Sequence, residues 1–115
     1  MKLALVVIAF LLTTPVLADV YGNNAGCALY LDAPGRTDQA LIWFPGDRVE
    51  FNADICPITG MRQIGIGAHL VTLSCTNRDK TWESVYLVRA MTDSDDFDFA
   101  PEANPGERTK VSLCQ

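Results

Sequence analysis

The 115-residue chain has few of the residue types and spacings from which catalytic and metal sites are recognised. It has one histidine, His69, and no G-x-S-x-G segment, so the usual sequence mark of a serine hydrolase is missing. Its four cysteines form no C-x-x-C pair and stand 29, 19 and 39 positions apart, which argues against a zinc site. No phosphate-binding glycine fingerprint occurs. We therefore expect no metal and no cofactor.

Basic residues are also scarce. The chain has nine lysines and arginines against fourteen acidic residues, a formal net charge of −5. Without Lys2, which lies in the N-terminal segment discussed next, eight basic and fourteen acidic residues leave −6. Nucleic acids and anionic membranes are bound by basic surfaces, so neither is an expected partner. The charge suits solubility, or a cationic protein partner.

Apolar runs long enough to span a membrane are absent from the sequence. The longest, residues 3–17, has 15 residues and contains Pro15, whereas a spanning helix needs about 20. Lys2 before it and small residues at its end are typical of an export signal. We predict a signal peptide at 1–18 and one periplasmic or secreted domain at 19–115, with no stable membrane insertion once the signal is removed.

The cysteines themselves indicate disulfides, because an even number in a short exported chain is typical of a disulfide framework. If the strand that begins at Cys56 pairs antiparallel with the strand that ends at Cys75, apolar residues and both sulfurs share one face. The expected register is Cys56–Cys75, Ile58–Leu73 and Gly60–Val71. The preferred pairs are therefore Cys56–Cys75 and Cys27–Cys114, although four cysteines allow three connectivities.

Alternation of apolar and polar residues predicts an all-β fold. We expect six or seven strands in a small antiparallel meander, either curled into a barrel or folded as a sandwich, with no helix longer than two turns. Residues 81–90 form the longest expected strand, and Pro57 places its strand at an edge or a bulge. Residues 22–26 are expected as a polar lead-in, 27–31 as one helical turn, 32–38 as a loop and 61–67 as a turn.

Three features of the sequence are candidate sites. The acidic run Asp93–Phe99 fails the EF-hand spacing, which favours a solvated turn between two strands. His69 is a hydrolase candidate only if Glu83 or Asp79 converges on it, and a lone histidine on a strand is more often structural. The aromatic residues Trp43, Trp82 and Tyr86 are most simply core residues; Trp82, if exposed, is the best candidate for a partner-binding anchor.

The contexts of the cysteines carry a resemblance. The residues concerned are Tyr21-Gly22, Cys27-Ala28, Glu50, Cys56-Pro57-Ile58, Val71 with Cys75, Trp82 and Leu113-Cys114. In this order the chain resembles a group of small uncharacterised secreted proteins of Gram-negative bacteria with four cysteines. Tyr21 stands where tryptophan is expected, and Glu50 is further from Cys56 than in that pattern. The resemblance implies an exported bacterial domain and transfers no catalytic or binding residue.

Small size, crosslinking and negative charge together favour a non-enzymatic domain that acts by binding a protein. One concrete version is an inhibitor of a cationic hydrolase such as lysozyme. Two alternatives stay open: a hydrolase that uses His69 with a nearby carboxylate, and a subunit of an envelope assembly that docks through an exposed strand edge.

Overall fold

The computed structural model describes residues 19–32, 39–52 and 54–115. The predicted signal peptide, 1–18, and all but the first residue of the loop expected at 32–38 lie outside the described residues. One helix and eight strands are present in the described part. Their bounds are β1 Tyr21–Gly22, α2 Asn24–Tyr30, β2 Leu41–Phe44, β3 Arg48–Phe51, β4 Asp54–Gly65, β5 Ala68–Asn77, β6 Lys80–Ala90, β7 Phe97–Pro101 and β8 Thr109–Leu113.

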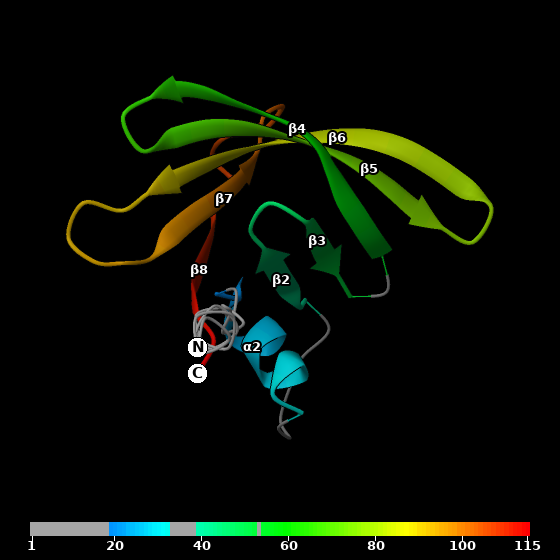
Figure 1. Cartoon of the computed structure of the whole chain (residues 1–115), viewed down its shortest axis with the longest axis horizontal. Helices are drawn as coiled ribbons and strands as arrows, with labels where there is room; N and C mark the ends of the chain where they lie inside the picture. The colour runs from blue at the N-terminus through cyan, green and yellow to red at the C-terminus, as the bar shows by residue number, and fades with distance from the viewer. Residues whose placement is uncertain (1–18, 33–38, 53) are drawn as a thin grey trace, which may run out of the picture.

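The strands form a closed antiparallel barrel in which each pairs with the next and β1 also pairs with β8 (Figure 1). The all-β prediction is confirmed, and the structure is a barrel, one of the two architectures expected. Eight strands are present instead of six or seven, because β1 is not predicted: Gly22 falls in the expected lead-in 22–26, and Tyr21 precedes it outside any expected strand. The two residues of β1 are too few to show alternation, and their partners, Trp43 and Leu113, lie far away in sequence.

The turn expected at 61–67 is also wrong. Strand β4 continues to Gly65, which makes it the longest strand at 12 residues, one more than β6. The turn that leads to β5 is only Ile66–Gly67, and Gly67 has the positive φ of +67° that glycine tolerates. Residues 61–65 resemble a loop in sequence because they contain glycine and polar side chains, but they pair with β5.

The register of β4 and β5 follows the prediction for one pair and then departs from it. Ile58 pairs with Leu73 as expected, but Gly60 pairs with Thr72 instead of Val71. The register shifts between Ile58 and Gly60, immediately after Pro57, where an edge or a bulge was expected. One extra residue in β4 accounts for the shift.

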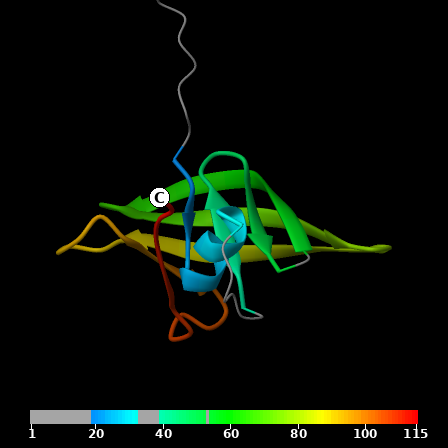
Figure 2. The ribbon, with the colours of Figure 1, turned by 90° about the horizontal axis from the view of Figure 1, so that it is seen from below.

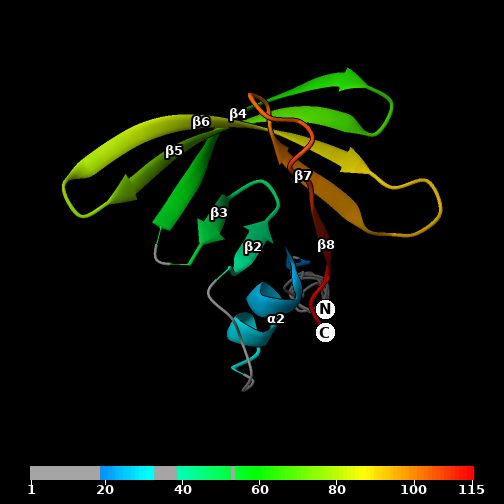
Figure 3. The same cartoon turned by 180° about the vertical axis from the view of Figure 1, so that it is seen from behind.

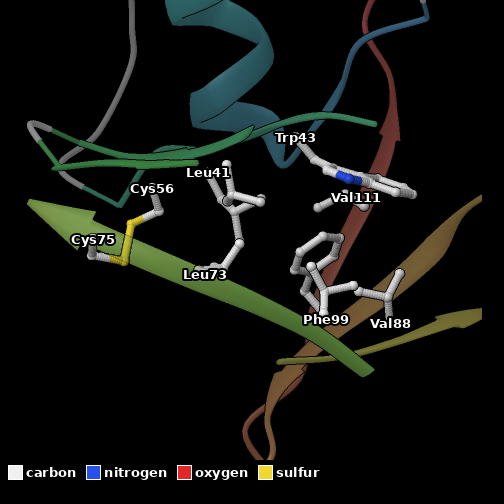
Figure 4. Packing of buried hydrophobic residues seen from close by; sticks show 10 residues of the cluster. Leu41, Trp43, Cys56, Leu73, Cys75, Val88, Phe99 and Val111 are labelled. Atoms are coloured by element: carbon white, nitrogen blue, oxygen red, sulfur yellow. A yellow bond between two sulfur atoms is a disulfide. The ribbon is translucent and has the colours of Figure 1, made fainter. Parts of the chain in front are cut away.

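Inward-facing residues of the strands fill the barrel (Figure 4). The buried cluster is Leu41, Trp43, Val49, Cys56, Val71, Leu73, Cys75, Val88, Phe99 and Val111. Burial of each such side chain contributes roughly 1.5–3 kcal/mol. Trp43 is a core residue as expected, whereas Tyr86 is only partly buried against the cluster.

The predicted disulfides are present: Cys27 is bonded to Cys114 and Cys56 to Cys75, the two preferred pairs. The first links α2 to the residue after β8, across a separation of 87 residues. The second joins β4 to β5 inside the core, across 19 residues (Figure 4). Chain entropy gives just under about 5 kcal/mol for the long loop and about 3 for the short one. Both are large beside a net stability of roughly 5–15 kcal/mol.

Helix α2 packs against β2, as the view from below shows (Figure 2). Asn23 caps it by accepting a hydrogen bond from the Gly26 N–H at 2.7 Å. A Cβ at Gly26 would lie 2.0 Å from the Leu41 carbonyl oxygen, so only glycine permits this approach. The helix begins three residues before the single turn expected at 27–31. No helix in the described residues is long and apolar enough to cross a membrane.

The three longest strands, β4, β5 and β6, extend beyond the barrel as two hairpins that project on opposite sides (Figures 1 and 3). Pairing with β3 covers only Asp54–Pro57 of β4, and pairing with β7 covers only Tyr86–Ala90 of β6. The outer parts of β4 and β6 therefore each pair along one side, with β5, among the residues that the structure describes.

Candidate functional site

Two connections project from one end of the barrel, which we call the acidic end and define as residues 61–67 and 91–96. The β4–β5 turn is held beside the end of β6, because the Ala90 N–H donates to the Gly67 carbonyl at 2.8 Å. The β6–β7 loop is closed by a hydrogen bond from the Met91 N–H to the Asp96 carbonyl at 3.0 Å. Both connections project on the same side of the molecule (Figure 1).

The tip of the β4–β5 hairpin, residues 61–67, is exposed and carries three large apolar side chains together with Arg62 and Gln63. Ile66, in the turn, has a relative exposure of 103%, and Met61 and Ile64, on β4, are about half exposed. Single apolar residues on a surface are ordinary, but three on one projecting hairpin are the kind of feature that marks a contact site.

The β6–β7 loop supplies the negative charge. Asp96 lies 3.5 Å from the Lys110 ammonium, and Asp98, at the start of β7, lies 3.7 Å from the Arg108 guanidinium. Asp93 and Asp95 make no ion pair with any residue in the described part of the chain. The run connects two strands as expected, and no set of side chains in the described segments could hold a metal ion.

A hollow of about 380 Å³ opens beside this loop, with Tyr21, Asp95 and Phe97 in its wall. Burial raises the pKa of the Tyr21 hydroxyl, and the charges of Asp19 and Asp95 raise it further. Both effects disfavour the tyrosinate anion, the second because negative charge gathers here. The acidic end therefore places three carboxylates, Asp93, Asp95 and Asp96, on the same side as a hairpin tip that carries exposed apolar residues and one cation, Arg62.

A second hollow, of about 320 Å³, lies at the opposite end of the barrel interior and is here called the barrel mouth. Its floor and walls are inward-facing residues: Leu41, Phe51, Tyr86, Phe99 and Thr109. The rings of Phe51 and Tyr86 stack with centroids 5.3 Å apart and an angle of 30° between their planes. An eight-stranded barrel has room inside for side chains or one small ligand, and here the side chains leave part of that room open.

The polar rim of the barrel mouth is fixed in place. The Ala40 N–H donates to the Asn52 side-chain oxygen at 2.8 Å, and the Leu41 N–H donates to the Asn23 side-chain oxygen at 3.0 Å. Burial raises the pKa of Tyr86, and the charge of Glu107 raises it further. Glu107 is the one charged group, and no basic residue lies among the described residues of the lining.

The structure does not bring His69 to either candidate carboxylate. His69 pairs with Val88 across β5 and β6, whereas Glu83 lies five residues further along β6, roughly 17 Å away. Asp79 is more distant still, in the β5–β6 turn. In the described segments, His69 makes no side-chain hydrogen bond or ion pair with a carboxylate. The convergence that a hydrolase would need is absent there.

Trp82 lies on β6 near the β5–β6 turn, with a relative exposure of 39%. It is paired with Cys75 in register and borders a hollow with Arg78 and Lys80. It therefore meets the condition of exposure set for an anchor. It lies in a partly basic setting, away from the acidic end.

Sequence reasoning missed both ends of the barrel as surfaces. Ile64 and Ile66 were assigned to an unremarkable turn, and Glu107 follows a segment treated as a loop. Two isoleucines in a glycine-rich connection could have indicated an exposed apolar surface, since turn residues are usually polar. The barrel mouth had no sequence signal, because Phe51 and Tyr86 come together only when the sheet closes.

Fold and sites define a class: a small, disulfide-linked, closed antiparallel barrel with a hollow at its mouth and an acidic end with a projecting apolar turn. Comparisons with family models, curated proteins and solved structures find no match to this chain.

Proposed function

We propose that this chain is an exported, non-enzymatic protein that binds a cationic protein through its acidic end, in the manner of an inhibitor of a cationic hydrolase such as lysozyme. The observation that carries the proposal is the projection, on one side of a disulfide-linked barrel, of the exposed Ile66 turn beside the Asp93 and Asp95 loop. Two disulfides suit an oxidising compartment, which agrees with the periplasm or the cell exterior.

The two parts of the acidic end supply different contributions to binding. Carboxylates attract a cationic partner from a distance and raise the association rate, an effect that salt screens. A projecting apolar residue enters a partner's cleft and slows dissociation once water is excluded. Because the turn is fixed to β6 by the Ala90 to Gly67 hydrogen bond, little freedom is lost on binding.

The test begins with protein exported from cells that express the full chain, mixed with lysozyme. We expect slower lysis of a cell-wall suspension and a complex whose affinity falls as salt is added. Replacing Ile66→Ser should weaken the complex roughly thirtyfold, as for a hot-spot residue worth about 2 kcal/mol. Replacing Asp93→Asn and Asp95→Asn together should weaken it roughly tenfold and flatten the dependence on salt.

Matched controls lie on the same strands away from the acidic end. Ile55→Ser replaces an isoleucine of β4 that is 52% exposed, and Glu83→Gln removes a charge from the far part of β6. Neither should change the affinity. If the test and control variants changed the affinity equally, the acidic end would not be the interface. Failure to inhibit or bind lysozyme, or any protein in a panel of cationic hydrolases, would remove the proposal.

The second candidate, a subunit of an envelope assembly, is favoured by the outer part of β4. Residues 59–65 pair with β5 on one side and extend past the end of β3 on the other. Such an edge can accept a further strand by backbone hydrogen bonds. A monomer in size-exclusion chromatography with no co-purifying envelope protein would count against this candidate, whereas a stable complex lost on the substitution Gln63→Pro would support it.

A further inference from the structure

The barrel mouth has a chemistry that the proposed function does not use. It lies at the opposite end of the barrel from the acidic end, since β8 runs from Thr109 at the mouth to Leu113 beside the acidic loop. We infer that it is a binding site for an alkylammonium group: a primary amine on a short aliphatic stem. This inference goes beyond the proposed function and does not depend on it.

The aliphatic stem is matched by the inner part of the hollow. Leu41 and Phe99 form its floor, and the stacked rings of Phe51 and Tyr86 form one wall. A volume of about 320 Å³ is at the lower limit for small-molecule sites, and the mouths of barrels are among the places where such sites occur. The space admits one short apolar chain.

The positive charge is matched by the rim. Glu107 borders the hollow, its charge is felt at the Tyr86 hydroxyl, and no cation lies in the described part of the lining. An ammonium between Glu107 and a ring face of the aromatic wall would gain an ion pair and a cation–π contact. An anionic ligand would meet repulsion from Glu107, and no basic group among the described lining residues offsets it.

The same molecule already binds a cation of its own in this way. The Arg48 guanidinium lies 3.8 Å from the centroid of the Phe44 ring, and its Nε donates to the Glu50 carboxylate at 2.7 Å. In the proposed complex, the rings of Phe51 and Tyr86 would contact the ligand's ammonium as the Phe44 ring contacts Arg48. Glu107 would take the part of Glu50. At the mouth the aromatic and acidic groups are present, and the described residues of the lining include no cation.

The ligand chemistry has two sources, a free small amine or a lysine side chain of another protein. The test is an NMR titration of the exported protein with hexylammonium, hexanol and hexanoate, and with lysine blocked at both its α-amino and α-carboxyl groups. We expect saturable shifts at Phe51, Tyr86 and Thr109, with affinity for hexylammonium on the order of 1 mM. Hexanol should bind roughly tenfold more weakly. Blocked lysine that binds as well as hexylammonium assigns the site to protein lysines, and weaker binding assigns it to free amines.

The variant Glu107→Gln isolates the charge without touching the core, because Glu107 is exposed. It should lower the affinity for hexylammonium about threefold to fivefold and leave hexanol binding unchanged. Glu102→Gln is the matched control, since Glu102 lies outside the mouth and should change neither. Hexanoate or hexanol binding as tightly as hexylammonium would overturn the inference, as would equal effects of the two variants or no saturable shift with any probe.

Discussion

The two ends of the barrel contain similar groups and differ in what balances their charge. Each has an inward-facing tyrosine whose pKa is raised by burial and by carboxylates, Tyr21 at the acidic end and Tyr86 at the mouth. At the acidic end Lys110 neutralises part of the charge within the molecule. At the mouth no cation lies in the described lining, and Glu107 faces an open hollow.

This difference separates two ways of using a carboxylate. The acidic end keeps Asp93 and Asp95 on a projecting loop, where their field reaches into solvent and can attract a large partner. The mouth holds Glu107 at the rim of a concave space, next to a hollow whose size suits a small group. In the two proposals above, carboxylates therefore act at a projecting surface at one end and beside a pocket at the other.

The largest expected effect comes from removing the disulfides one at a time. Cys27→Ala with Cys114→Ala opens the longer loop, next to the acidic end, and should lower the free energy of unfolding by just under about 5 kcal/mol. Cys56→Ala with Cys75→Ala opens the shorter loop and should cost about 3 kcal/mol. Urea unfolding measures both. The reverse order would show that packing around the buried pair outweighs chain entropy.

Phe99→Ala should destabilise the packing at both ends of the barrel. The Phe99 ring lies 5.2 Å from Trp43 and 6.2 Å from Tyr86, so one buried side chain supports both aromatic groups. We expect a loss of about 3–5 kcal/mol in thermal or urea unfolding, from lost burial and the cavity left behind. The control Ile66→Ser should change stability by less than about 0.5 kcal/mol. A small effect of Phe99→Ala would mean that the two ends are supported separately.

Asn23→Ala should act on the mouth and on the start of α2, and leave the acidic end unchanged. The Asn23 side chain caps α2, accepts from the Leu41 N–H and donates to the Gln39 carbonyl at 2.6 Å. We expect a cost of about 1–2 kcal/mol and NMR shifts at the rim and in the first turn of α2. The neighbouring substitution Asn24→Ala removes an exposed amide at the first helical position and serves as the control. Equal losses of stability in the two variants would show that the hydrogen bonds of the Asn23 side chain do not stabilise the rim.

The smallest effect concerns the two tyrosines. Because folding raises both pKa values, the fold prefers the protonated phenol; this stability is complete below the unfolded value of about 10 and is lost as pH rises through the folded values. Asp95→Asn should lower the pKa of Tyr21 only, and Glu107→Gln that of Tyr86 only, in an alkaline titration followed by tyrosinate absorbance. A shift of both tyrosines by one substitution would contradict the separation of the two ends.

Local alternation was enough to predict seven strands, the Cys56–Cys75 bridge and the pairing of Ile58 with Leu73, because each depends on a period of two and a short connection. The Cys27–Cys114 bridge, across 87 residues, followed because these two cysteines were the remaining pair. Strand β1 was not predicted, because it exists only through long-range pairing with β2 and β8. The extension of β4 was missed because Gly60 and Gly65 lower strand propensity, while β5 still supplies partners for them.

The candidate sites were less predictable than the fold. Trp82 was recognised from sequence as a possible anchor, and its exposure depends on how far β6 projects beyond the barrel. The mouth joins Phe51, Tyr86 and Glu107 from three separate elements, and no short motif spans that distance. A site of this kind can be recognised only from the three-dimensional structure, because its residues come together when the sheet closes.

The contrast between the two tryptophans gives the protein a built-in optical probe. Trp43 is 8% exposed in the aromatic interior, and Trp82 is 39% exposed on a projecting hairpin. An indole in an apolar interior emits at shorter wavelength than one in contact with water, so the two residues report on different regions. Trp82→Phe would leave Trp43 as a reporter of barrel opening, and Trp43→Phe would leave Trp82 as a reporter of events at the hairpin.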